Sequence, residues 1–380
     1  MSAARPLSPG HGVPCEESTK MTRRQAGPQS GFSLIELMVA LTVTLVVTGA
    51  IYGLLSGGQS AFRREPELTD RQQNARVALN LIMRDIANAG SGMPKFIQTF
   101  SQNLNNCTNN ATCPADTGRI TRPDVPAEVP DELEMLTNSG TKENEPACHT
   151  PGNGNSSQVR TVRQTNSVQV PQIVLLFTTT GLWTIREVVN TSTNNSRAGN
   201  CDPAPHTGLN FNAGRDTTGL NRPSGVCEPN GWGTIVDNGA CEVQEVSFAT
   251  VVRYRVRLDA SGVPVLQRWS SDDVNLLTGG NLTYQTIARG IEDLEVQYTQ
   301  APTPNTWVDG APQVVNNDYT TLITQVRITL VARAEGKKLQ GQKTSASGRT
   351  NVRGTLTSVG TPRATLVNLN SAPAAQRQWF

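Results

Sequence analysis

Residues 32–55 read FSLIELMVALTVTLVVTGAIYGLL, a long run of apolar side chains near the start of the chain. As an α-helix, 24 residues span about 36 Å at 1.5 Å per residue, enough to cross a bilayer core of about 30 Å. The apolar region of a secretory signal is shorter, about 7–15 residues, and is followed closely by a small-residue cleavage site, which this run lacks. We therefore predict a transmembrane helix at 32–55 that remains in the mature protein.

Glu36 is the only charged residue in this run. A carboxylate costs roughly 2.5–3.5 kcal/mol at the centre of a bilayer and less toward its interface. Its position leaves two interpretations open. Glu36 either lies at headgroup depth, or it has a partner such as an amino group near the N-terminus of the helix, where the helix dipole also favours negative charge.

The residues from Gly31 to Glu36 (GFSLIE), with the apolar helix behind them, resemble the type III signal of type IV pilins and type II secretion pseudopilins. The resemblance implies that a prepilin peptidase cuts between Gly31 and Phe32 and N-methylates Phe32. It also implies that Glu36 is the carboxylate required for processing and assembly. The new amine of Phe32 could pair with Glu36 of a neighbouring subunit, compensating the buried charge and setting the axial register.

The leader, residues 1–31, is longer than is usual for this family. Met21 offers an alternative start that gives a short basic leader, in which case residues 1–20 are a start-site artefact. Arg23 and Arg24 would keep the leader in the cytoplasm. The expected location is the inner membrane, single-pass, with a periplasmic head that is incorporated into a pilus at the cell surface.

Beyond the membrane the same helix is predicted to continue, so that the N-terminal pilin helix covers 32–90. One apolar face recurs at helical spacing, with the members Ala75, Ala78, Leu79, Ile82, Ile86 and Ala89. A polar stripe lies on another face, with the members Arg76, Asn80, Arg84 and Asn88. The sequence GSGMP at 90–94 should end the helix.

Pro66 and several glycines are expected to bend or loosen the middle of this helix. Gly49, Gly53 and Gly57 are spaced four residues apart. That spacing allows close packing between helices, but it could equally mark a stretch that melts in a filament, and both interpretations stay open.

Downstream, the hydrophobic pattern changes from the helical period to the two-residue period of β-strands. Residues 251–258 alternate, 259–262 form a turn and 263–269 return, which predicts a hairpin. Further strands are expected at the following ranges: 172–177, 291–298 and 322–331. The fold class is therefore α+β, a long helix packed on an antiparallel β-sheet head. Residues 91–250 are expected to be a loop-rich, disulfide-containing variable region, and 251–380 the C-terminal β-rich part of the head.

Within the pilins, the chain resembles the PilW-type minor pilins. The resemblance is carried by residues 74–90, by the stretch GIEDLEVQY at 290–298 and by VRITLV at 326–331. It is close over the first ninety residues and loose over the last hundred.

Seven cysteines are present, and Cys15 precedes the apolar run. The exported part thus carries an even set of six, which suits an oxidising compartment. The candidates for disulfides are Cys107, Cys113, Cys148, Cys201, Cys227 and Cys241. Short loops favour the pairs Cys107–Cys113 and Cys227–Cys241, which leaves Cys148–Cys201.

Other chemistry has little support in the sequence. His149 and His206 lie near cysteines, but no zinc spacing is present, and both are expected to be surface loop residues. The oxygen-rich residues Asp309, Asn316, Asn317 and Asp318 could bind calcium, although a plain polar turn explains them better. We expect no catalytic residues, no metal and no cofactor. A net charge of +2 makes nucleic acid unlikely to be the main partner.

The expected function is that of a minor pilin subunit, not an enzyme, that supports type IV pilus assembly or priming and through it motility, adhesion or DNA uptake. Its expected partners are the prepilin peptidase, other pilins through the N-terminal helix, the inner-membrane assembly platform and the membrane itself. The alternatives are a minor pseudopilin of a type II secretion system and a membrane-tethered adhesin. An anchored enzyme hidden in the middle region is a third class. Removal of 31 residues from the 380-residue chain would leave 349, which is large for a pseudopilin.

Overall fold

The chain divides into two units, Met1–Gln59 and Ser60–Phe380, in a computed structural model. The structure describes the following residues, with the side chains of 60–64 outside the description: 31–93, 97–101, 130–138, 145–148, 158–162, 168, 170–178, 183–194, 205–211, 221, 243–271, 283–315, 318–334 and 353–373.

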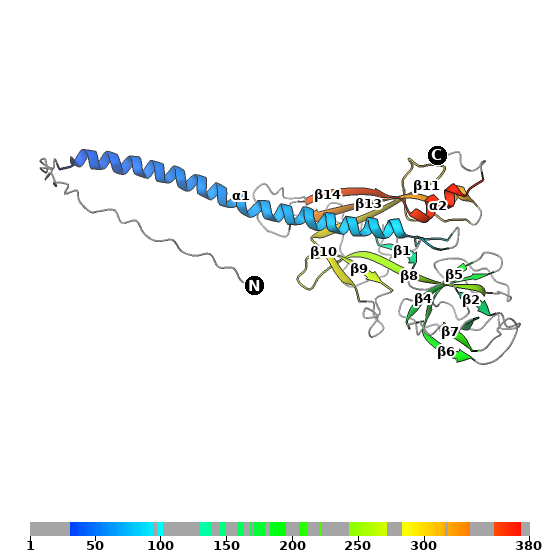
Figure 1. The fold of residues 1–380 in the computed structure, drawn as a ribbon. Helices are drawn as coiled ribbons and strands as arrows, with labels where there is room; N and C mark the ends of the chain where they lie inside the picture. Colours follow the sequence, from blue (N-terminus) through cyan, green and yellow to red (C-terminus); the bar gives the residue numbers. More distant parts are fainter. Residues whose placement is uncertain are drawn as a thin grey trace, which may run out of the picture. The chain divides into compact units, whose positions relative to one another are not determined.

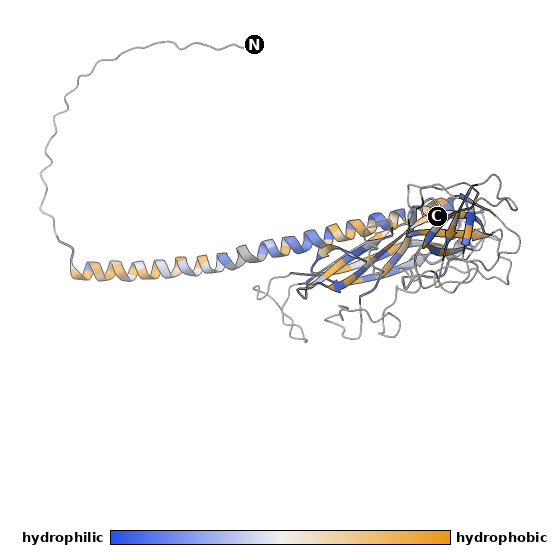
Figure 2. Cartoon of the chain, turned by 90° about the horizontal axis from the view of Figure 1, so that it is seen from below, coloured by the Kyte–Doolittle hydropathy of each residue, from blue (hydrophilic) through white to orange (hydrophobic). Residues whose placement is uncertain are grey.

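Helix α1 (Leu34–Asn88) is the longest element and contributes to both units. In the first unit, Leu34–Gln59 form a 26-residue helical stretch that is long and apolar enough to cross a membrane, and none of it is buried within the protein. Figure 2 shows this stretch as mostly hydrophobic. The helix passes through Pro66 without a break, since a proline removes one backbone donor while the flanking hydrogen bonds can persist.

In the second unit, α1 packs with one face against the sheets. Every member of the predicted apolar face is buried, with exposed fractions of 0–8%. The predicted polar stripe is exposed. The helix ends at Asn88, slightly before the predicted limit, and Gly90 follows with a φ of 69°. Its N–H donates to the carbonyl of Leu136, which ties the end of the helix to the first strand.

The strands form two antiparallel sheets, and Figure 1 shows their arrangement around α1. The larger, ten-stranded sheet contains β1 (Leu133–Asn138), β2 (Glu145–Cys148), β3 (Gln158–Thr161), β4 (Gln172–Thr178), β5 (Trp183–Val188), β6 (Asn190–Asn194), β7 (His206–Asn210), β8 (Val243–Leu258), β9 (Pro264–Ser270) and β10 (Gln285–Arg289). The smaller sheet has the order β12-β11-β13-β14, from β11 (Ile291–Gln300), β12 (Val308–Asp309), β13 (Ile323–Arg333) and β14 (Arg353–Gly360). Among the described residues there are also two short helices, η2 (Tyr319–Thr321) and α2 (Arg363–Asn370).

Strand β8 organises the larger sheet because its two halves have different neighbours. Its first half pairs with β4 and β2, and its second half pairs with β1 and β9. The hairpin of β8 and β9 is the one that the alternating sequence predicted. On the face of β8 that points away from α1, Arg253 pairs with Glu134 and Arg257 with Glu132, so that charged pairs also join β8 to β1 and the residue just before it.

Residues 91–250 contain more regular structure than the sequence suggested. The described residues there include seven strands, β1–β7, and β8 runs through residue 250. Of these seven, the sequence predicted β4, as the strand 172–177, and the structure confirms it. These strands are short, and some, such as the NTSTN of β6, are polar. Such segments lack a period of their own and become strands because neighbouring strands pair with them.

Asp85 joins α1 to the larger sheet through a buried network. The Tyr254 hydroxyl donates to Asp85 Oδ2 at 2.6 Å, and Arg268 Nε donates to the same oxygen at 2.9 Å. Tyr254 is fully buried and Asp85 nearly so. Burial raises the pKa of the Tyr254 hydroxyl, and the negative charge of Asp85 raises it further, whereas Arg268 opposes the shift. Tyr254 therefore stays neutral in the folded head.

Glycines in β14 let this strand approach α1 closely. A Cβ at Gly360 would overlap Met83 Cε and lie 3.3 Å from Ile86 Cγ2. At Gly354 it would lie 3.1 Å from the guanidinium carbon of Arg71. Gly354 and Gly360 lie on the same face of β14. The strand therefore presents only backbone to α1 at both ends of their contact.

Gly290 links the two sheets at the step from β10 to β11. Its N–H donates to the carbonyl of Pro264 in β9, and its carbonyl accepts from the N–H of Arg333 in β13. Its φ is 75°, and a Cβ there would lie 2.6 Å from the Arg333 carbonyl oxygen. The turn therefore needs glycine both for its conformation and for space.

We expect Gly290→Ala to destabilise the head by about 3 kcal/mol or more, because it adds a backbone clash to the cost of a left-handed conformation. Gly262→Ala is the matched control. Gly262 has a φ of 74° but nothing within 4 Å of an added Cβ, so the control should lose only about 1 kcal/mol. Urea unfolding of the full chain in detergent micelles measures both, and equal losses would contradict the clash.

The stability of the head at alkaline pH should depend on the buried hydroxyl of Tyr254. Its pKa is raised on folding, so its contribution is complete below the unfolded pKa of about 10 and is lost as the pH rises above it. Tyr284, whose pKa burial also raises, acts in the same direction. Between pH 9 and 11, the free energy of unfolding of Tyr254→Phe should fall less steeply than that of the wild type, by up to about 1.4 kcal/mol per pH unit. Identical slopes in urea titrations would show that Tyr254 ionises freely in the folded head.

Candidate assembly site on the N-terminal helix

The backbone around Gly31 to Glu36 forms the start of α1. Gly31, Phe32 and Ser33 precede the helix, and the Ser33 carbonyl accepts from the N–H groups of Glu36 at 3.0 Å and Leu37 at 3.1 Å. Ser33 thus occupies the N-cap position, and Glu36 lies in the first helical turn. The positive end of the helix dipole is there, which favours a carboxylate.

The sequence Ser33-Leu34-Ile35-Glu36 also has the pattern of a capping box, S-x-x-E, in which the serine and glutamate side chains bond backbone donors at the helix start. Sequence reasoning overlooked this signal. In the described part of the chain, the Glu36 carboxylate is exposed and makes no hydrogen bond or ion pair. The carboxylate is therefore available to a group outside the chain.

Phe32 is 83% exposed, and a Cβ added at Gly31 would meet nothing within 4 Å. No described residue therefore crowds the peptide bond between them. This exposure is compatible with access by a peptidase.

The apolar surface of α1 is continuous across the first unit. Fifteen large hydrophobic side chains from Phe32 to Leu55 are at least half exposed. Monomeric soluble proteins rarely expose a contiguous apolar patch of more than a few hundred Å². This surface therefore needs a covering of lipid or of other apolar helices.

The hydroxyl groups in this stretch do not break its apolar character. Thr42 donates to the Val39 carbonyl at 2.9 Å, and Thr44 and Thr48 donate to carbonyls one turn earlier at 2.7 Å. Their hydrogen bonds are satisfied within the helix, as a lipid environment requires. The sequence shows the threonines, but only the structure shows where their hydroxyls point.

Gly49, Gly53 and Gly57 lie within α1, and an added Cβ at any of them would meet nothing within 4 Å. The isolated chain contains no contact that requires glycine at these positions. Their two open interpretations, close helix packing and melting, remain predictions.

The predicted disulfides lie largely outside the described residues. Cys148, at the end of β2, takes part in a disulfide. Its partner is outside the described part of the chain, as are Cys107, Cys113, Cys201, Cys227 and Cys241. The pairing favoured by the sequence therefore stays a prediction.

His206 was expected on a surface loop, and this prediction was wrong. It lies in β7 with no exposed surface, and its Nδ1 is 3.4 Å from the Val162 carbonyl oxygen. The sequence did not predict a strand here because β7 (HTGLN) is short and polar and shows no clear two-residue alternation. His149 and the calcium candidates Asn316 and Asn317 are outside the described residues.

The other two calcium candidates serve local structure. Asp318 caps η2, where its Oδ1 accepts from the N–H of Thr320 at 3.0 Å. Asp309 accepts from the Gln297 side chain at 2.8 Å. Within the described ranges, no group of three or more His, Cys, Asp or Glu residues could hold a metal ion.

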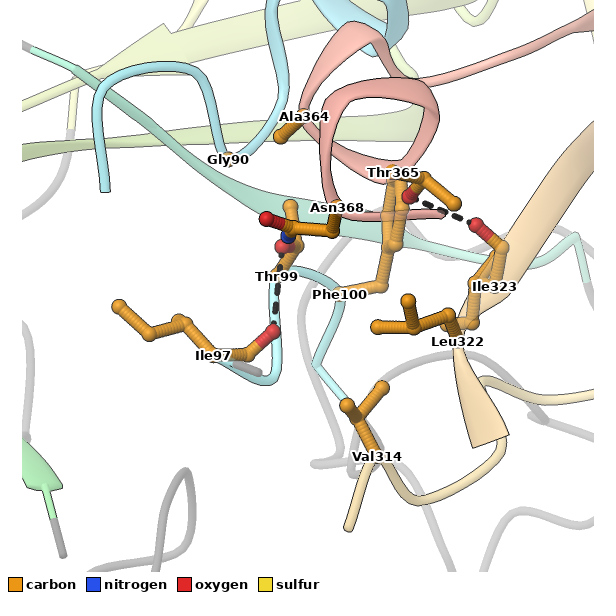
Figure 3. Close-up of a pocket in the computed structure, with 10 residues that line it drawn as sticks. All are labelled: Gly90, Ile97, Thr99, Phe100, Val314, Leu322, Ile323, Ala364, Thr365 and Asn368. Atoms are coloured by element: carbon orange, nitrogen blue, oxygen red, sulfur yellow. Dashed lines mark hydrogen bonds between the residues drawn. The ribbon is translucent and has the colours of Figure 1, made fainter. Parts of the chain in front are cut away.

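The cavity in Figure 3 lies where the end of α1, the segment 97–100 and α2 meet. Its volume is about 20 Å³, room for about one water. The polar side chains among its ten lining residues are Thr99, Thr365 and Asn368, and Thr365 donates to the Ile323 carbonyl at 2.9 Å. This set contains no acid, base or activated nucleophile, so the cavity is a packing feature of the head.

Comparison with known proteins assigns two parts of the chain. Residues 27–52 match the model of the prokaryotic N-terminal methylation motif, and residues 253–366 match that of type IV pilus-assembly protein W. No curated protein and no solved structure matches the chain. The first match covers Gly31, Phe32 and Glu36, and the second runs from the second half of β8 into α2.

These two matches agree with the structure. The apolar start of α1 fits a single-pass, membrane-anchored pilin, and the mostly antiparallel body confirms the predicted α+β class. The matched families are structural and not enzymatic. The chain thus carries a prepilin-type methylation motif at its N-terminus and a C-terminal region similar to type IV pilus-assembly protein W, and together these support a type IV pilin-like minor pilin.

Proposed function

We propose that this protein is a minor pilin that primes or assembles a type IV pilus from the inner membrane, with its head in the periplasm until extraction. The observation that carries the proposal is the exposed apolar stretch of α1 with one acidic residue, Glu36, at its start. A membrane can cover the apolar surface, but it leaves the carboxylate without a partner. A bundle of similar helices can supply both an apolar covering and an amine.

In this mechanism the prepilin peptidase cleaves between Gly31 and Phe32 and methylates the new amine. The amine then pairs with Glu36 of an adjacent subunit while the assembly platform extracts the helix from the bilayer. Support comes from the position of Glu36 in the first turn, where its carboxylate is exposed. The pair would be formed in a low-dielectric bundle, where an unpaired charge is costly.

Mass spectrometry of the mature N-terminus tests the processing step. We expect the purified chain to begin at Phe32 and to carry one added methyl group on its amine. In a strain without the peptidase, the chain should keep its leader. A mature chain that begins at any other residue would exclude Gly31 as the cleavage position.

Glu36→Ala separates a filament subunit from a membrane tether. The variant should remain in the membrane fraction but be lost from sheared pili, because removing one partner of a buried ion pair costs roughly 3–5 kcal/mol. Glu65→Ala is the control, since Glu65 is an exposed acid on the same helix beyond the apolar stretch. A tethered adhesin would be indifferent to both changes.

The choice between a pilus and a type II secretion pseudopilus depends on the phenotype. Loss of a pilus subunit should abolish piliation and the motility, adhesion or DNA uptake that depends on it, and leave secretion intact. The match to a pilus-assembly protein over 253–366 favours this outcome. Loss of secretion with normal pili would favour the pseudopilin.

A further inference from the structure

Arg71 is a half-buried cation on α1, within the second unit. Its Nη1 is buried and has no hydrogen-bond partner, and no carboxylate in the described part of the chain forms an ion pair with it. A buried donor nitrogen without a partner is costly, because it has lost water and gained no hydrogen bond in exchange.

The position of the guanidinium is set by β14. It lies over the bare backbone of Gly354, where an added Cβ would be 3.1 Å from both Cζ and Nη2. Glycine leaves the space that the planar group occupies. Arg71 is therefore held at a defined place beside the strand, while Arg76, one turn further along α1, is exposed.

The nearest arginines at this end of the smaller sheet are already paired. Arg353, the neighbour of Gly354, donates to Glu292 Oε2 at 2.5 Å, and Arg333 donates to Glu292 Oε1 at 3.2 Å. One buried carboxylate thus serves two arginines, and both of its oxygens are occupied. Arg71 is a third cation in this region without a charge to match it, and burial lowers the pKa of its guanidinium.

We propose that Arg71 is an assembly contact that binds a carboxylate on the helix of a neighbouring pilin-like subunit. This inference rests on the proposed function, because it needs α1 to lie beside other helices. A guanidinium fork suits a carboxylate, which it can bind through two parallel hydrogen bonds. This chain shows the kind of partner, since Asp70 is an exposed acid on the same stretch of α1.

A carboxylate is a better candidate than a lipid phosphate. Twelve residues separate Arg71 from Gln59, where the apolar stretch ends. In helical conformation they cover about 18 Å, which is well beyond the hydrocarbon edge. A contact at this level would add a second polar constraint to the one at Glu36 and would fix the stagger between adjacent helices.

Arg71→Met tests the proposal, because methionine keeps an apolar stem and removes the cation. In detergent micelles the melting temperature of the full-length variant should equal or exceed that of the wild type, since an uncompensated charge is gone. Its incorporation into sheared pili, relative to the membrane pool, should fall at least about tenfold, as expected when a desolvated charge pair loses one member. Arg76→Met is the control and should be incorporated like the wild type.

Arg71→Lys should recover only part of the incorporation, because it restores the charge but not the planar fork. A photo-crosslinking residue at position 71 should form an adduct with a neighbouring pilin beside an acidic residue. A lower melting temperature for Arg71→Met would overturn the proposal, since it would show that Arg71 has a stabilising partner within its own chain.

Two further outcomes are distinguishable from each other. If the wild type enters pili and Arg71→Met enters equally well, the inference about Arg71 fails and the proposed function stands. If the wild type is absent from pili, both fail together.

Discussion

The exposed apolar surface of Leu34–Gln59 is the constraint on which the rest of this molecule depends. None of this helical stretch is buried within the protein, although its mean hydropathy is 2.2. A surface of this kind is stable in water only when lipid or other helices cover it. The prepilin-type motif at 27–52 lies in the same part of the chain, which fits a membrane-anchored helix.

The head is built so that α1 is firmly attached to it. One face of the helix is buried against both sheets, and Asp85 accepts hydrogen bonds from Tyr254 and Arg268 of the hairpin. Buried ionic groups contribute little net stability, because desolvation offsets their attraction. Their defined geometry instead restricts how the helix can slide or rotate on the sheet. Within the second unit, α1 is therefore held by directional contacts as well as by apolar packing.

The matched C-terminal region and the middle of the chain have different characters. The region 253–366 contains the smaller sheet, the hairpin and the Gly290 link between the sheets. The strands between residues 133 and 210 add to the larger sheet through β8 and carry short polar sequences such as that of β6. Of these strands, β1 also packs against α1 through Leu133 and Met135, so the buried face of the helix is covered from both parts of the head.

The sequence by itself determined the apolar helix, the anomalous Glu36, the buried face of α1 and the strands with strong alternation or apolar runs. These features are local, because a helix or a half-buried strand imposes its own period on neighbouring residues. Only the tertiary structure decided that β1–β3 and β5–β7 are strands, that His206 is buried, and that Tyr254 and Arg268 meet Asp85. It also decided that Arg71 lies over Gly354 without a partner. Several of these contacts join residues far apart in the sequence, 169 positions for Asp85 and Tyr254 and 183 for Asp85 and Arg268. No local pattern encodes them, since they depend on which strands pair and which face each side chain then takes.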